Sequence, residues 1–346
     1  MHNRLANPSS PTLPRSVFTR NAAANQGAAI SLRQGSLTLE NTSFVSNSLS
    51  STTGGTNGGA VYAEQCAVSI TASTFTRNSA LGAGGRGGGL FMTGSRASIT
   101  RSTFFANSAS GQGGAMMAYQ TWLTMNDSVV AGNIAPLGGG VAMYDAVPKV
   151  TLLQLTAPAS PLLAASPPPP PSLPPLPPSP PPAPAGNLTS GYVAQTTLSD
   201  SFFGEFVNTT FTQNSCSDGL NMGGGGLYVR EQVERWNVLV YKCTFVSNSC
   251  PRGGGMLSGY LQRTYIVRSE FRLNRATIEG GAVTMTPSND RGSYLLIQEN
   301  QFVNNTAKIL GGAVQVGWAD VRWGQVRLRG GWGRCVADRT RLTGTY

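Results

Sequence analysis

Residues 67–78 read AVSITASTFTRN and residues 87–92 read GGGLFM, and this pair of segments recurs along the chain. The first segment alternates apolar and polar residues, as a short strand does, and ends in a Phe-x-x-Asn element. The second is a glycine run followed by apolar residues. The Phe-x-x-Asn element occurs at Phe18/Asn21, Phe44/Asn47, Phe75/Asn78 and Phe104/Asn107, as the variant Val130/Asn133, and again at Phe211/Asn214, Phe245/Asn248, Phe271/Asn274 and Phe302/Asn305.

The intervals between repeats vary in a restricted way. Phe18 and Phe44 are 26 residues apart, as are Phe245 and Phe271, whereas Phe211 and Phe245 are 34 apart. The extra residues lie either before the glycines or between two strands. Insertions at fixed points are typical of a solenoid with constant rungs and variable turns. We therefore predict an all-β fold, a right-handed single-stranded parallel β-helix (a solenoid) interrupted by a polyproline segment.

The repeat has a direct physical interpretation. Parallel stacking places equivalent residues about 4.8 Å apart in successive coils, so the Phe rings are expected to form one internal column. Burial of each ring is worth roughly 1.5–3 kcal/mol. We expect each Asn to adopt the left-handed conformation and to bond the next Asn as an amide ladder. The glycine pairs are expected to permit a tight turn and close approach of neighbouring backbones.

The alternation of Phe-x-x-Asn with Gly-Gly-Ala-Val resembles the repeats of the chlamydial polymorphic outer-membrane proteins. The resemblance covers residues 15–145 and 205–317 approximately. It implies a β-helix and, in that family, a secreted passenger concerned with adhesion. Autotransport is not carried over, because the first residues, MHNRLANPSS, lack the apolar region of a signal peptide. We expect the chain to be a fragment.

A proline tract, SPPPPPSLPPLPPSPPPAP, separates the two blocks of repeats. Such a sequence adopts extended polyproline II. It resembles the hydroxyproline-rich modules of extracellular-matrix glycoproteins in green algae and plants, which implies the secretory route. The tract is either a loop in one β-helix or a linker between two, and a single interrupted stack is favoured. The segment VTLLQLT at 150–156 is interpreted as the strand of a coil whose Phe turn was replaced by the tract.

These patterns divide the chain into five parts. We predict a poorly ordered start at 1–14, β-helix coils at 15–157 and a proline-rich loop or linker at 158–190. Coils then resume at 191–317, and a basic tail without the repeat, predicted to be disordered, occupies 318–346.

Two kinds of modification site are suggested by the sequence. Cys216 and Cys250 each follow a repeat Asn by two residues, one coil apart, and adjacent rungs lie within disulfide reach. A disulfide is expected if the chain is extracellular, and two free thiols on a turn remain the alternative. Asn-x-Ser/Thr acceptor sequences for N-glycosylation occur at Asn41, Asn126, Asn187, Asn208 and Asn304.

Catalytic residues are sparse. The single histidine is His2, outside the repeat, which argues against histidine-based chemistry. Glycoside hydrolysis needs two carboxylates roughly 5–10 Å apart. Asp127 and Glu299 share a repeat phase, but they are expected several coils apart, as are Glu64 and Glu231. No C-x-x-C pair or acidic cluster suggests a metal site, and we predict no cofactor.

The charge and hydropathy restrict the remaining function classes. The net charge is +10, of which residues 317–346 contribute +4, so we interpret the rest as a diffusely basic surface and predict no nucleic-acid partner. No apolar stretch reaches the eighteen or so residues of a membrane span. We expect a non-catalytic, secreted or cell-surface repeat protein, structural or adhesive, whose partner is extracellular polysaccharide or a wall or matrix glycoprotein. The alternative is a β-helix enzyme of the polysaccharide lyase or glycoside hydrolase type.

Overall fold

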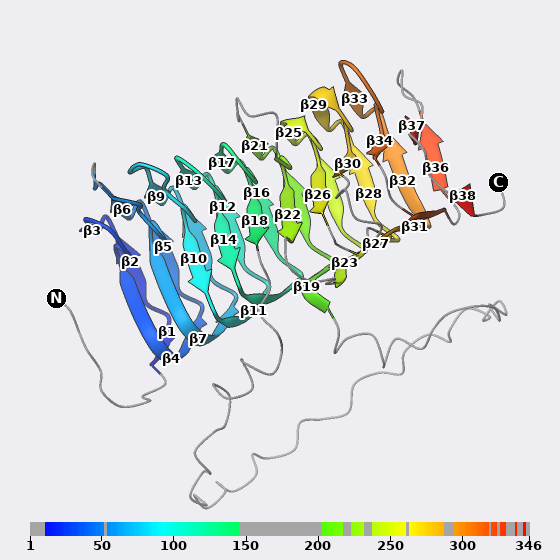
Figure 1. Ribbon diagram of the computed structural model, residues 1–346. Helices are drawn as coiled ribbons and strands as arrows, with labels where there is room; N and C mark the ends of the chain where they lie inside the picture. The colour runs from blue at the N-terminus through cyan, green and yellow to red at the C-terminus, as the bar shows by residue number, and fades with distance from the viewer. Residues whose placement is uncertain are drawn as a thin grey trace, which may run out of the picture.

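The computed structural model describes residues 11–51, 54–144, 202–216, 223–231, 237–260, 263–286 and 294–317, and the backbone of strands at 320–323, 326–329, 336–337 and 342–343. Every regular element in these residues is a β-strand. The strands follow one another around a series of stacked coils, whose axis runs from the N-terminal to the C-terminal end (Figure 1). All pairings between named strands are parallel and join one coil to the next, for example β8 to β12 and β12 to β16.

Each coil contains four strand positions, and equivalent strands form four ladders along the axis. Ladder 1 follows the glycines. It contains β10 (Leu90–Thr93), β14 (Met116–Tyr119), β18 (Val141–Tyr144), β22 (Leu227–Glu231), β26 (Met256–Tyr260), β30 (Val283–Thr286), β34 (Val314–Val316) and β37 (Val336–Ala337). Ladder 2 contains β1 (Thr12–Pro14), β11 (Arg96–Thr100), β15 (Trp122–Asn126), β19 (Phe202–Val207), β23 (Asn237–Tyr241), β27 (Arg263–Val267), β31 (Tyr294–Gln298), β35 (Asp320–Trp323) and β38 (Leu342–Thr343). The long strands β4 (Ile30–Glu40) and β7 (Val61–Thr71) run through both ladders, which makes them one sheet.

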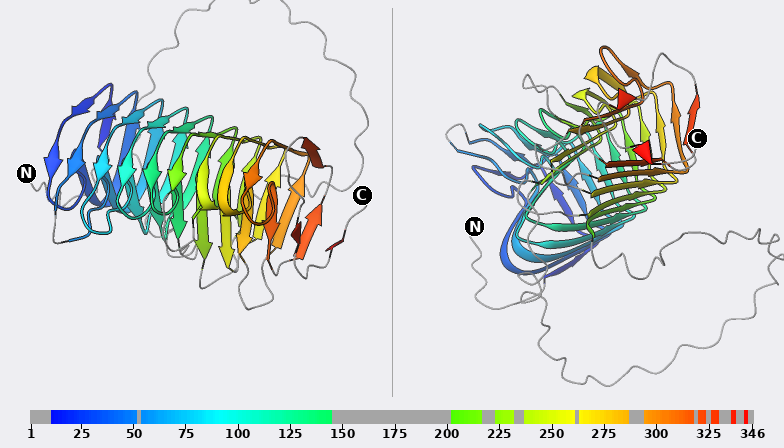
Figure 2. Two further views of the ribbon diagram at one scale, coloured as in Figure 1. Left: turned by 90° about the horizontal axis from the view of Figure 1, so that it is seen from above. Right: turned by 45° about the vertical axis from the view of Figure 1, so that its right-hand side comes forward.

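The other two ladders are separate sheets. Ladder 3 carries the Phe residues and contains β2 (Val17–Thr19), β5 (Ser43–Val45), β8 (Thr74–Thr76), β12 (Thr103–Phe105), β16 (Val129–Ala131), β20 (Thr210–Thr212), β24 (Thr244–Val246), β28 (Glu270–Arg272), β32 (Asn300–Val303) and β36 (Val326–Arg329). Ladder 4 is short-stranded and contains β3 (Ala22–Ala23), β6 (Ser48–Leu49), β9 (Ser79–Ala80), β13 (Ser108–Ala109), β17 (Ile134–Ala135), β21 (Ser215–Cys216), β25 (Ser249–Arg252), β29 (Arg275–Glu279) and β33 (Thr306–Ala307). Figure 2 shows the coils stacked in order along the axis.

The Phe column lies inside the solenoid, as predicted. Successive rings are stacked with centroids 4.6 to 5.0 Å apart and planes within 15° of parallel, on both sides of the proline tract. Phe75, Phe104, Phe245 and Phe271 are fully buried, and Val130 continues the column where the sequence has no Phe. Because this column is continuous with the apolar side chains of ladders 1 and 2, it forms one hydrophobic core along the axis.

The Asn ladder is also confirmed, and its geometry is more complete than the sequence indicated. Asn78 illustrates it: its Oδ1 accepts bonds from the backbone N–H and the Nδ2 of Asn47, while its Nδ2 donates to Phe44 O and to Asn107 Oδ1. The Asn-to-Asn bonds from Asn21 to Asn305 measure 2.8 to 3.1 Å. In the internal coils the amide therefore uses both its acceptor sites and both its donors in a buried position.

The ladder has the same geometry in the coils after the proline tract. The Oδ1 of Asn274 accepts the backbone N–H and the Nδ2 of Asn248, both at 3.0 Å. Its Nδ2 donates to Phe245 O at 2.9 Å and to the Oδ1 of Asn305 at 2.9 Å. Asn274 is fully buried, so its amide is satisfied entirely by the neighbouring coils.

One detail of the predicted Asn turn is wrong. The left-handed residue is not the Asn but the residue before it, such as Arg77 (φ 55°) before Asn78 or Leu273 (φ 55°) before Asn274. The left-handed residue turns the chain, and the Asn that follows is thereby directed inward, where its side chain accepts a backbone N–H from the preceding coil. The correction applies to every predicted member of the ladder, which are Asn21, Asn47, Asn78, Asn107, Asn133, Asn214, Asn248, Asn274 and Asn305.

The corner between ladders 2 and 3 has the same form. Arg101 (φ 49°) precedes the buried Ser102, whose hydroxyl oxygen accepts the backbone N–H of Ser73 in the preceding coil at 3.1 Å. Both corners of ladder 3 thus combine a left-handed residue with a small buried polar side chain.

The glycine pair has two separate roles. The first glycine, such as Gly87 (φ 62°), adopts a left-handed conformation that a side chain would strain. The second has no room for a side chain, because a Cβ on Gly88 would lie 2.3 Å from Gly114 O. This confirms both the tight turn and the close backbone approach that the sequence predicted.

The coils on either side of the proline tract form one continuous stack. Strand β15 pairs with β19, β16 with β20 and β18 with β22, and Asn133 bonds to Asn214 across a sequence separation of 81. The insertion lies between β18 of ladder 1 and β19 of ladder 2, at a corner of one coil. It therefore does not replace a Phe turn, because the coil that contains it keeps Phe211. The tract and VTLLQLT themselves lie outside the described residues.

Parallel pairing extends beyond both predicted ends of the repeat. At the start, β1 pairs with β4 from Thr12 onward, inside the segment predicted to be poorly ordered. At the other end, β35 pairs with β31 and β36 pairs with β32, with Leu328 in register with Phe302. The prediction of a disordered tail from 318 is therefore wrong for these strands. The repeat was missed there because the Phe and Asn that identify it are replaced.

Replacing a ring of the internal column should destabilise the solenoid strongly. We expect Phe245→Ser to lower the free energy of unfolding by about 3–5 kcal/mol or more, since it leaves a cavity between two stacked rings and buries a hydroxyl. Equilibrium denaturation measures this change. Phe245→Leu, which keeps most of the volume, should cost less than half as much, and equal losses for the two variants would contradict the stacked interior position.

Removal of one rung of the amide ladder should be nearly as costly. In Asn107→Ala the backbone N–H and Nδ2 of Asn78 lose their acceptor and Phe75 O loses a donor, all in buried positions. Unmet buried polar groups cost about 1–3 kcal/mol each, so we expect a total loss of about 3 kcal/mol or more. The neighbouring half-buried Ser108→Ala is the control and should change stability by roughly 0.5 kcal/mol at most. Thermal and urea unfolding of the two variants would separate these outcomes.

Candidate functional site

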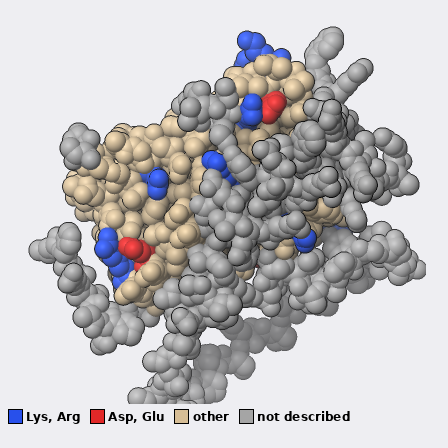
Figure 3. All heavy atoms as spheres, viewed as in Figure 1, with Lys and Arg blue, Asp and Glu red and all other residues tan. Residues whose placement is uncertain are grey.

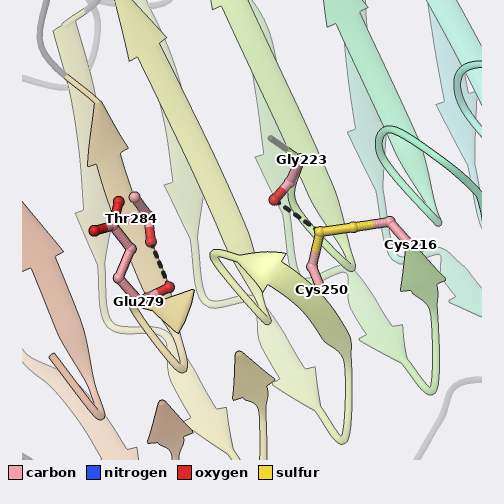
Figure 4. Close-up of a disulfide and its surroundings, with 5 residues drawn as sticks. All are labelled: Cys216, Gly223, Cys250, Glu279 and Thr284. Carbon is pink, nitrogen blue, oxygen red and sulfur yellow. Dashed lines mark hydrogen bonds between the residues drawn. A yellow bond between two sulfur atoms is a disulfide. The ribbon is translucent and has the colours of Figure 1, made fainter. Parts of the chain in front are cut away.

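The two predicted cysteine partners are joined in the structure. Cys216 ends β21 and Cys250 lies in β25, so they occupy the same position of ladder 4 in adjacent coils, with Cα atoms 4.8 Å apart and a disulfide between them (Figure 4). Gly223 lies directly against the bridge, with its carbonyl oxygen 2.8 Å from the Sγ of Cys250. A Cβ at Gly223 would lie 3.1 Å from both sulfurs, a tight contact, and the φ of 124° also favours glycine at this position.

Two other cysteines are buried in the structural corners and are not reactive-site candidates. Cys66 and Cys243 take the place that Ser or Thr holds in other coils, and the Sγ of Cys243 contacts Phe206 O at 3.3 Å. Burial raises the pKa of the Cys66 thiol to about 11 and that of Cys243 to about 12, so both remain protonated at neutral pH. Cys335 lies outside the described residues.

The acceptor sequences for glycosylation fall mainly on exposed corners. Asn41, Asn208 and Asn304 are exposed residues with positive φ at turns of the coil. Asn126 is half-buried at the end of β15, and Asn187 lies outside the described residues. Three of the five are thus accessible by geometry, although the Nδ2 of Asn208 donates to Asp127 Oδ1 at 2.7 Å.

The acidic pairs considered from the sequence are not brought together. Asp127 and Glu299 lie on one corner line, but the coils of Asn208, Lys242 and Arg268 separate them. Glu299 is paired with Arg268, with an N–O distance of 2.7 Å. Burial raises the pKa of Glu205 above its usual value, but Glu205 lies on a different face, in ladder 2. Among the described residues no three His, Cys, Asp or Glu side chains gather in a metal-binding group.

A second apolar cluster lies on the outer side of ladder 1, around Tyr62, Phe91 and Tyr228. The polar groups around Tyr62 are paired with one another. The hydroxyl of Tyr62 donates to Glu64 Oε2 at 2.8 Å, and Arg33 forms an ion pair with the same carboxylate at 3.0 Å. Burial, together with Glu64, raises the pKa of Tyr62 to about 12.

The outer side of ladder 3 is different, because it presents uncharged side chains over many coils. We call it the hydroxyl strip. Along it, the hydroxyl of Thr74 donates to the Ser43 hydroxyl of the preceding coil at 3.0 Å. The strip consists of the outward residues of seven strands, which are Val17, Thr19, Ser43, Val45, Thr74, Thr76, Thr103, Phe105, Val129, Ala131, Thr210, Thr212, Thr244 and Val246.

Two rows of corner residues border the strip. We call them the rims: one row precedes each strand of ladder 3 and the other follows it. Four exposed arginines lie on the rims of the first four coils, Arg15 and Arg101 before the strand and Arg20 and Arg77 after it. Where grey atoms do not cover it, the face turned to the viewer in Figure 3 shows a few small groups of blue and red atoms on a tan surface. The sequence did not reveal these rims, since their members are far apart along the chain.

Comparison with known proteins agrees with this architecture. Residues 5–154 match the family model described as a right handed beta helix region. The described residues of this part, 11–51 and 54–144, form a right-handed β-helix. The parallel pairings continue the same solenoid beyond residue 154, through the coils after the insertion. No curated protein and no solved structure matches the chain. In the described part of the chain, no helix is long and apolar enough to cross a membrane.

Loss of the Cys216–Cys250 bridge should destabilise the coils that follow the insertion. The bridge closes a loop of 34 residues, for which chain entropy predicts about 3–4 kcal/mol. We expect Cys216→Ser/Cys250→Ser to show this loss in urea unfolding and to abolish the effect of a reductant on stability. Cys66→Ser is the control and should keep the reductant effect. Peptide mapping without reduction that links either cysteine to another partner would contradict the pairing.

Proposed function

We propose that this chain is a non-catalytic, secreted or cell-surface β-helix with a structural or adhesive role, and that its hydroxyl strip contacts wall or matrix polysaccharide. The strip is the observation that carries the proposal. It offers hydroxyl groups in six of its seven coils, and successive coils lie about 4.7–4.9 Å apart along the axis, which is the separation of paired strands. An extended polymer of sugar rings presents hydroxyls and C–H groups in a similarly repetitive way.

The chemistry of the strip suits a glycan. Threonine side chains donate and accept hydrogen bonds, while their methyl groups and the valines provide apolar contact for the faces of sugar rings. The β-branched residues have restricted χ1 rotamers, so little side-chain entropy is lost when a ligand binds. A long ligand that contacts many coils weakly gains affinity from the number of simultaneous contacts.

Three further features support a location outside the cell. The disulfide of Cys216 and Cys250 is typical of oxidising compartments. The repeat resembles that of the chlamydial polymorphic outer-membrane proteins, where the β-helix is a secreted adhesive passenger. The proline-rich sequence between the two blocks resembles modules of green-algal extracellular-matrix glycoproteins. All three are consistent with a protein of the cell surface or matrix.

The proposal is tested by measuring the binding of the protein to purified wall and matrix polysaccharides with affinity electrophoresis and calorimetry. In the triple variant Thr74→Val, Thr103→Val and Thr210→Val the shape of the strip is kept but three hydroxyls are lost. Because a hydrogen bond contributes about 0.5–1.5 kcal/mol, we expect at least a roughly tenfold loss of affinity.

The matched control removes three hydroxyls from the outer side of the neighbouring ladder 2, in Thr38→Val, Thr71→Val and Thr100→Val. These residues are half-buried on outward positions, and their replacement should leave binding unchanged. Equal loss in both variants, or no binding by the unmodified protein to any polysaccharide, would overturn the proposal. Release of new reducing ends or unsaturated products would contradict its non-catalytic part.

A further inference from the structure

We infer that the N-terminal part of the hydroxyl strip, between the rim arginines Arg15, Arg20, Arg77 and Arg101, binds an acidic polysaccharide, a polymer of uronic acids. This inference rests on the proposed function and specifies its ligand.

Backbone conformation does not explain arginine at these positions. All four have φ between 49° and 55°, a region where non-glycine residues are uncommon. Equivalent corners in neighbouring coils hold Asn41, Ala72, Ser46 or Ala106 instead. The turn therefore accepts many side chains, and four exposed guanidinium groups on one face are a feature of the surface and not of the fold.

The rim arginines differ in their pairing from four of the other described arginines. Arg33, Arg252, Arg268 and Arg272 form ion pairs with Glu64, Glu279, Glu299 and Glu270, respectively. By contrast, none of the four rim arginines has a side-chain hydrogen bond or ion pair with another described residue. The positive charge at the N-terminal end of the strip is thus uncompensated, whereas Arg272, on ladder 3 of a later coil, is neutralised by Glu270 in its own strand.

Two carboxylates lie near this region, and neither forms an ion pair with a rim arginine. Glu40 is exposed at the end of β4, beside the corner of Arg15, whose backbone N–H bonds to Glu40 O. Asp127 follows Arg101 on the same rim in the next coil and accepts a hydrogen bond from Asn208. The four arginines therefore outnumber the adjacent acids, and the uncharged strip lies between them.

This arrangement fits the chemistry of a polyuronate. The ring hydroxyls and C–H groups of the polymer match the threonines and valines of the strip, and guanidinium groups bind carboxylates with two parallel hydrogen bonds. Arg20 and Arg77 are two coils apart, roughly 10 Å along the axis, so they reach different sugar residues of one extended chain. Nucleic acid is disfavoured, because single strands are held by several stacked aromatic rings and this strip exposes only Phe105.

The test uses the full chain with two forms of one polymer, polygalacturonate and its fully methyl-esterified derivative, which lacks the charges. In Arg15→Gln/Arg20→Gln/Arg77→Gln/Arg101→Gln we expect about tenfold weaker binding to polygalacturonate, as four exposed charge pairs are lost. The unmodified protein should bind the esterified polymer more weakly than it binds polygalacturonate. The variant and the unmodified protein should bind the esterified polymer with equal affinity. Asn41→Gln is included in every protein, so that a glycan on this rim cannot mask the strip.

The matched control is Arg86→Gln/Arg96→Gln/Arg263→Gln/Arg275→Gln, which removes the same charge from exposed positions outside the strip. It should retain full affinity, and thermal unfolding should show that both variants are folded. Equal loss in the control would mean diffuse attraction and would overturn the inference. Preference for the esterified polymer, or rim-dependent binding of single-stranded DNA as strong as that of polygalacturonate, would also overturn it. If neutral polymers bind through the threonines as tightly as polygalacturonate does, the proposed function stands without the inference, whereas absence of all polysaccharide binding removes both.

Discussion

The fold depends on the buried amide ladder more than on any other interaction. A buried amide has two donor hydrogens and two acceptor sites, and leaving one unmet costs about 1–3 kcal/mol. In this solenoid Asn78, Asn107, Asn274 and their equivalents meet all four through the coils immediately before and after. A shift in register by one residue would break every one of these bonds at once. The ladder thus sets the register, and the stacked Phe rings of the same turns contribute apolar burial in that register.

This constraint divides the residues of each coil into two groups. Inward positions, including the inward residue of each corner, are determined by the ladders: rings, small polar side chains and glycines recur there because geometry allows little else. Outward positions on the strands are not restricted in this way beyond a preference for β-branched residues. Left-handed corners are restricted in backbone conformation but not in side chain, as Arg77, Ala106 and Ser247 show. Specific function is therefore expected on outward strand positions and corners, which is where the hydroxyl strip and its rims lie.

The same division explains what the sequence predicted and what it did not. The Phe and Asn columns could be predicted from the sequence because one residue type recurs at the same position of each repeat. The disulfide was predicted from two cysteines at equivalent positions of adjacent repeats. The left-handed corner before each Asn was missed, since Arg, Ser, Gln and Leu all occupy it. The strands beyond residue 317 were missed because Leu328 takes the position of Phe302 in the next coil. The rims were missed for another reason: Arg20 and Arg77 lie on one row of corners, and that row can be recognised only once the register is known.

The insertion between β18 and β19 follows from the same logic. The corner between ladders 1 and 2 carries no rung of the amide ladder. The chain can therefore leave the stack there and return without breaking the hydrogen bonds between Asn133 and Asn214. An insertion at the Phe-x-x-Asn turn would instead interrupt the buried column and leave amides unpaired. The tolerance of the solenoid for long insertions is thus a property of particular corners. It allows a proline-rich segment to be added to a β-helix while the hydroxyl strip on ladder 3 continues from β16 to β20 in unbroken register.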